Sequence, residues 1–162
     1  MNRKLMSSIV MFAVGLGLGI VSRLLDIYAQ NLGEVFSQMA IWILFGTLIS
    51  IYSKTAKKAA LNVFPFCVGM LITYYAVAVM TQGVYGTNFI IGWTLFALCS
   101  PVLAVLAWNS KEKGIFPGVI RIGIVAVSVL SSILLFDRLR IYDLVIDGML
   151  VYFLFFKKVQ RH

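Results

Sequence analysis

Six long, nearly uncharged apolar runs follow one another along this chain of 162 residues. They cover residues 7–28, 36–52, 59–80, 88–108, 117–136 and 140–156. Each run is close to the ~20 residues with which an α-helix crosses the ~30 Å hydrocarbon layer of a membrane. The runs lack the alternating pattern of membrane strands, and a helix satisfies its own backbone in lipid. We therefore expect six membrane-spanning helices.

The basic residues are distributed unevenly between alternate loops. If the N-terminus is placed in the cytoplasm, only Arg23, Arg138 and Arg140 fall on the outer side, out of fourteen lysines and arginines. An excess of lysine and arginine in cytoplasmic loops sets the orientation of membrane proteins. The pattern predicts that both termini are cytoplasmic. The inner side holds the other basic residues: Arg3, Lys4, Lys54, Lys57, Lys58, Lys111, Lys113, Arg121, Lys157, Lys158 and Arg161.

Together these patterns predict the fold class, an all-α polytopic integral membrane protein. Residues 1–162 form a single six-helix transmembrane domain, since the short loops leave no room for a soluble one. The expected location is the cell membrane, as a multi-pass protein of a bacterial cytoplasmic membrane. The formal charge of +8 is interpreted as orientation and as affinity for anionic inner-leaflet lipids, so we expect the lipid bilayer as a partner and no nucleic acid.

The N-terminal run resembles a signal peptide, because Arg3 and Lys4 precede it. No small-x-small cleavage site follows, and Arg23 and Asp26 stand where one would be expected. We interpret the run as a retained first helix.

The first helix carries a stripe of small residues. Gly15 and Gly19 form a GxxxG motif, and Ala13 and Gly17 form an overlapping pair with the same spacing. Such stripes let helix backbones approach closely in lipid. The stripe predicts helix packing, either within the bundle or against a second copy or a partner membrane subunit.

Ionisable residues in the outer half of the predicted bundle are the strongest candidates for a site. Asp143 and Asp147 are four residues apart and share one helix face. Arg23 of the first helix lies at a depth similar to that of Asp147, with Asp26 one turn above it, so we expect Arg23 to contact Asp147 or Asp143. Tyr74 lies about two turns below the outer surface. Charged groups at this depth are costly and usually functional, and these residues predict either a site for a small solute or cation, or a structural ion pair.

Two features inside the predicted helices bear on packing. Pro101 in the fourth helix frees the carbonyl of Ala97, and Ser100 is placed to satisfy it. Cys67 and Cys99 both fall inside predicted spans, where we interpret them as apolar fillers rather than as a disulfide or ligand pair.

No catalytic motif supports an enzyme. Tyr142-Asp143 matches the YD pair of intramembrane aspartyl proteases, but their GxGD motif is missing. The spacing of Asp143 and Asp147 is one residue too long for the DxxD motif of phosphatidyl-alcohol transferases. The only histidine is His162, which excludes histidine-based triads within the membrane. We therefore expect no enzymatic activity, no cofactor and no metal.

The second and third predicted helices resemble a family of small bacterial membrane proteins of unknown function. The matching features are a tryptophan-bearing helix (Trp42), a lysine-rich inner loop, the Asn62-Val63-Phe64…Tyr74-Tyr75 pattern, and a later Ser100-Pro101 helix that ends near Trp108. The resemblance covers roughly residues 40–110. It implies six helices and no particular activity.

A second resemblance is architectural. Substrate-binding components of energy-coupling-factor transporters are also six-helix proteins of this size, and they dock their partner through small residues on the first helix. Two classes of function therefore remain open. One is a transport protein or transport subunit with a polar site in the outer half, and the other is a non-catalytic accessory membrane protein that acts by helix packing.

Overall fold

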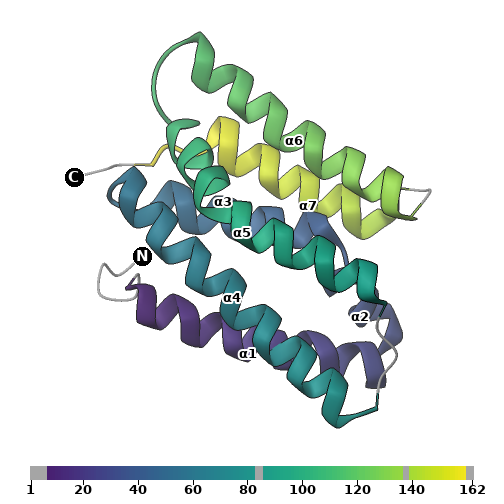
Figure 1. The fold of residues 1–162 in the computed structure, drawn as a ribbon. Coiled ribbons are helices and arrows are strands. Elements are labelled where there is room, and N and C mark those ends of the chain that lie inside the picture. The colour runs from purple at the N-terminus through teal and green to yellow at the C-terminus, as the bar shows by residue number, and fades with distance from the viewer. Residues whose placement is uncertain (1–6, 83–85, 137–138, 160–162) are drawn as a thin grey trace.

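The computed structural model describes residues 7–82, 86–136 and 139–159 (Figure 1). Every described element is helical. The α-helices are α1 (Ser8–Tyr28), α2 (Gln30–Phe36), α3 (Met39–Tyr52), α4 (Ala56–Met80), α5 (Thr87–Asn109), α6 (Ile115–Phe136) and α7 (Ile141–Val151). A short π-helix, η2 (Tyr152–Phe156), continues α7.

Four of these helices are long and apolar enough to cross a membrane: α1, α4, α5 and α6. The all-helical fold is therefore confirmed, and these four helices are compatible with a membrane helical bundle. α3 is apolar but only 14 residues long. The predicted final run, 140–156, is divided between α7 and η2.

The short helix α2 was not predicted by the sequence. It occupies the segment before the second apolar run, and α3 begins at Met39 rather than at residue 36. The indole nitrogen of Trp42 donates a hydrogen bond to the carbonyl of Phe36 (2.7 Å). This bond satisfies one of the carbonyls that are left free at the end of α2.

α1 and α4 are in backbone contact along their length. A Cβ atom added at Gly15 would lie 2.2 Å from the carbonyl oxygen of Phe66, and one added at Gly69 would lie 2.7 Å from that of Phe12. The Thr73 hydroxyl of α4 donates to the carbonyl of Leu16 on α1 (2.7 Å). The glycines therefore serve packing within the bundle, one of the two uses that the sequence predicts.

On the other side of the bundle, α3 packs against α7 and η2. Ala40 and Leu44 of α3 form a buried cluster with Ile146, Leu150 and Leu154. In Figure 1, α6 and α7 lie at one side of α3 and α5, while α1 and α4 lie at the other. α1 and α7 are therefore not neighbours.

The turns between α3 and α4 and between α5 and α6 meet at one end of the bundle, together with the end of η2. The Trp108 indole donates to the Ser53 carbonyl (3.0 Å), and the Lys111 ammonium donates to the carbonyls of Phe153, Leu154 and Lys157. We call this the basic end, defined by Lys54, Lys57, Lys58, Lys111, Lys113, Arg121, Lys157 and Lys158. The opposite end, where α1 ends and α5 and α7 begin, is called the far end.

Candidate functional site

The five predicted ligand-binding residues all lie toward the far end, but they form two separate groups. Arg23 forms an ion pair with Asp26 of its own helix (3.7 Å). Asp147 accepts a hydrogen bond from Ser128 of α6 (2.5 Å). The prediction that Arg23 contacts Asp147 or Asp143 is therefore wrong. The physical reason is that the glycines of α1 pack it against α4, which leaves α3 and α6 as the neighbours of α7.

We call the first group the Asp26 cluster: Arg23, Asp26, Ser37 and Tyr74. The Tyr74 hydroxyl donates to Asp26 Oδ2 (2.6 Å), and the Ser37 hydroxyl donates to Asp26 Oδ1 (3.0 Å). The Arg23 guanidinium lies 5.6 Å from the centre of the Tyr74 ring, within the range of a cation–π contact. Both carboxylate oxygens are therefore occupied, and the charge of Asp26 is balanced by Arg23.

The sequence places Arg23, Asp26 and Tyr74 in the outer half of the bundle, and the structure brings them together. It does not single out Ser37, which lies just after α2. Gly33 allows this arrangement, because a Cβ there would lie 2.6 Å from the Cα of Asp26. α2 thus folds back onto the end of α1 and delivers Ser37 to the carboxylate.

An aromatic cavity of ≈ 400 Å³ lies beside the Asp26 cluster. Tyr74 and Ser37 belong both to the cluster and to the wall of the cavity. We call it the aromatic cavity, because six of its lining residues are aromatic. The lining comprises Phe36, Ser37, Trp42, Met70, Leu71, Tyr74, Tyr75, Gly86, Phe89 and Trp93.

We call the second group the Asp147 cluster: Ser128, Asp143 and Asp147, all of them buried. Asp143 Oδ2 accepts a hydrogen bond from the backbone nitrogen of Arg140 (2.9 Å) and so caps the start of α7. Its other oxygen is buried without a hydrogen-bond partner among the described residues. Arg140 itself pairs with Glu34, so Asp143 acts first as a helix cap.

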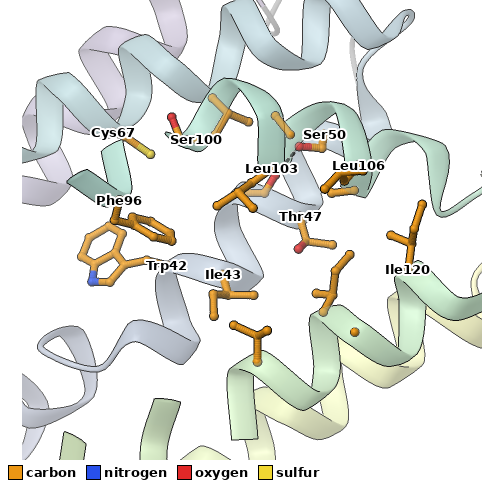
Figure 2. Close-up of a pocket in the computed structure, with 17 residues that line it drawn as sticks. Trp42, Ile43, Thr47, Ser50, Cys67, Phe96, Ser100, Leu103, Leu106 and Ile120 are labelled. Atoms are coloured by element: carbon orange, nitrogen blue, oxygen red, sulfur yellow. Dashed lines mark hydrogen bonds between the residues drawn. The ribbon is translucent and has the colours of Figure 1, made fainter. Parts of the chain in front are cut away.

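A second cavity, of ≈ 280 Å³, lies between α3, α4, α5 and α6 (Figure 2). We call it the apolar cavity. Trp42 lines both cavities. The lining comprises Trp42, Ile43, Gly46, Thr47, Ser50, Val63, Cys67, Phe96, Ser100, Leu103, Ala104, Leu106, Ala107, Ile120, Gly123, Ile124 and Val127.

Sequence reasoning missed Ser128 and both cavities. The hydroxyls of Ser128, Ser131 and Ser132 inside an apolar run were a usable signal, because they mark the face of α6 that meets α7. The cavities left no such signal, since their lining residues come from helices far apart in the sequence. Within the described part of the chain, no group of three or more His, Cys, Asp or Glu side chains is placed to hold a metal ion.

The chain matches no protein-family model, no curated protein and no solved structure.

Proposed function

We propose that this chain is a six-span membrane protein that binds a small solute in the aromatic cavity, as a transport protein or transport subunit. The observation that carries the proposal is the aromatic cavity itself, with the hydroxyls of Tyr74 and Ser37 held in its wall by Asp26. Small-molecule sites are typically concave, 300–1,000 Å³ in volume and largely apolar, with a few fixed polar groups. The aromatic cavity has each of these properties.

The proposed orientation places the basic end in the cytoplasm and the aromatic cavity in the outer half of the bundle. The described basic residues support it, because eight of them lie at the basic end, whereas Arg23 and Arg140 lie at the far end. Both termini are then cytoplasmic, in the cell membrane of a bacterium. α3 and the α7–η2 pair supply the fifth and sixth spans, although both are shorter than the other four helices.

The chemistry of the lining favours a neutral solute with a flat ring. Flat aromatic walls stack on planar ligands. The charges of Arg23 and Asp26 balance each other, and both oxygens of Asp26 already accept hydrogen bonds. Arg23 also lies against the Tyr74 ring, which makes that ring a poorer partner for a second cation. The cavity thus presents ring faces and hydroxyls but no uncompensated charge.

The proposal is tested with fluoroindole as a neutral planar probe, using fluorine NMR on the full chain in nanodiscs and empty nanodiscs as the blank. Phe89 lines the cavity and is 66% exposed, so Phe89→Ala should cost little stability. It should weaken binding about two- to tenfold, because an aromatic contact is worth ~0.5–1.5 kcal/mol. Benzyltrimethylammonium, a cation of similar size, should bind more weakly than fluoroindole.

Phe116→Ala is the matched control. Phe116 is 65% exposed and, like Phe89, lies in the first turn of its helix, but it does not line the aromatic cavity. Binding should be unchanged in this variant. Equal binding by the Phe89 and Phe116 variants, or a signal no different from that of empty nanodiscs, would reject the aromatic cavity as a solute site.

A second candidate function is that of an accessory protein that acts by helix packing. One observation favours it: Ala13 and Gly17 of α1 point away from α4, and a Cβ at Gly17 would meet nothing within 4 Å. This half of the stripe is free to receive a helix of a second copy or of a partner subunit. The variant Gly17→Leu distinguishes the two candidate functions. It should abolish assembly with a partner, as measured by crosslinking, and leave fluoroindole binding intact. Membership of the family of small bacterial membrane proteins that residues 40–110 resemble is likewise a proposal.

A further inference from the structure

The apolar cavity offers a hydrocarbon surface to whatever fills it. Its serine hydroxyls are already used, because Ser50 donates to the carbonyl of Gly46 (2.7 Å) and Ser100 donates to that of Ala97 (2.7 Å). Apart from Thr47, Cys67 and two glycines, the other lining residues are aliphatic or aromatic (Figure 2). An occupant therefore gains burial of apolar surface and few hydrogen bonds.

The cavity is elongated along the bundle and runs toward the basic end. Phe96 and Ala107 both line it and are eleven residues apart on α5, which corresponds to ~16 Å at 1.5 Å per residue. This is about half of the ~30 Å hydrocarbon thickness, or the depth of one leaflet. A cavity of this length and chemistry fits an extended acyl chain.

The cavity is open on the side where α5 faces α6. Leu103 of α5 and Val127 of α6 both line it and are about half exposed, and a Cβ at Gly123 would meet nothing within 4 Å. Figure 2 shows Leu103 and Leu106 on one side of the space and Ile120 on the other. In a membrane this opening faces lipid tails.

Positive charge lies where the cavity approaches the basic end. Arg121 follows the lining residue Ile120, and its guanidinium donates to the carbonyls of Ser110 (2.6 Å) and Glu112 (3.2 Å). Those bonds hold the turn between α5 and α6, on which Lys113 is exposed. An anionic headgroup at this surface is attracted by the basic residues, because Lys and Arg side chains near a membrane surface attract anionic lipids.

We propose that the apolar cavity binds one acyl chain of an anionic phospholipid from the leaflet at the basic end. The chain enters between α5 and α6 and extends toward Trp42, while the phosphate stays near Lys113. The proposal does not rest on the proposed solute, although Trp42 lines both cavities.

The experiment uses Trp42 as a reporter, because its side chain lines the cavity yet is only 4% exposed. Surrounding lipid reaches such a residue poorly. The full chain with Trp93→Phe and Trp108→Phe is placed in nanodiscs of phosphatidylglycerol brominated in mid-chain. Bromine should quench Trp42 fluorescence, and Gly123→Phe should reduce this quenching at least twofold by filling the cavity.

Gly118→Phe is the matched control. Gly118 lies on the same helix, and a Cβ there also meets nothing within 4 Å, but it does not line the cavity. It should leave the quenching unchanged. Equal quenching in the two glycine variants, or none in either, would overturn the proposal.

Native mass spectrometry of the chain with all its tryptophans gives a second measurement if the reporter variant does not fold. One retained phosphatidylglycerol per chain, lost in Gly123→Phe and kept in Gly118→Phe, supports the site. Retention of phosphatidylcholine to the same extent would overturn the proposed preference for an anionic headgroup. A dimer that disappears only in Gly123→Phe would show that a second copy occupies the cavity instead.

Discussion

Each carboxylate of α7 is bound by a different neighbour, although both lie on one helix face. Asp143 caps its own helix through the backbone nitrogen of Arg140, and Asp147 accepts the Ser128 hydroxyl of α6. Asp147 thus joins two helices, whereas Asp143 mainly fixes the start of one. A buried charge that is held by a single donor makes that donor important for stability.

Ser128→Ala should lower the free energy of unfolding by about 1–3 kcal/mol, because it leaves Asp147 buried without its donor. In an Asp147→Asn background the same change should cost about half as much, since hydrogen bonds to charged groups are about twice as strong as neutral ones. Thermal or denaturant unfolding in detergent measures both values.

Arg23→Gln tests whether the Asp26 cluster and the Asp147 cluster are energetically independent. Its effect should add to that of Asp147→Asn within ~0.3–0.5 kcal/mol, because the two residues share no partner. Strong coupling between Arg23 and Asp147 would contradict the separation of the two clusters.

These residues show the limit of counting along the sequence. Counting places Arg23, Asp26, Tyr74, Asp143 and Asp147 in the outer half of the bundle, because each helical residue advances a fixed 1.5 Å. It does not say which helices are neighbours. That depends on contacts such as Gly15 against Phe66, and those contacts put α4 between Arg23 and the rest of the bundle.

At the level of helices, α1 and α4 approach each other most closely at glycines, because a Cβ added at Gly15 or Gly19 of α1 would overlap α4. Ala13 and Gly17 face away from it, while Gly15 and Gly19 lie within it. The stripe predicted from the sequence is therefore two stripes with different surroundings. Only one of them is used inside the bundle.

Gly15→Ala should destabilise the protein by about 1–3 kcal/mol, the usual cost of overpacking. All three atoms nearest to the added Cβ belong to the backbone of Phe66 and cannot rotate away. Gly17→Ala should change stability by less than ~0.5 kcal/mol, since its Cβ meets open space. The free energies of unfolding of the two variants, measured in the same detergent, test this difference. Equal losses of stability would show that α1 does not pack as described.

Helices were easier to predict than their short connections. The apolar runs locate α1, α4, α5 and α6 to within a few residues, because hydropathy over 20 residues is a strong signal. The prediction that Ser100 satisfies the carbonyl freed by Pro101 is confirmed by its bond to Ala97 (2.7 Å). α2 was missed, because seven residues that contain a glycine and a glutamate resemble a loop.

For the molecule as a whole, the proposed orientation makes a direct prediction. A cysteine at Asn88, at the far end, should react with an impermeant maleimide from outside only, and one at Lys113 from inside only. Both positions are exposed, and Cys67→Ala and Cys99→Ala remove the background thiols. The reverse labelling pattern would invert the proposed topology.

The side chain of Trp42 lines both the aromatic cavity and the apolar cavity. Its indole nitrogen donates a hydrogen bond to the carbonyl of Phe36. A ligand that pushes the ring from one side changes the space on the other. By linkage, each occupant must then change the affinity of the other by the same factor. A membrane whose lipids fill the apolar cavity would in this way set how tightly the outer solute is held.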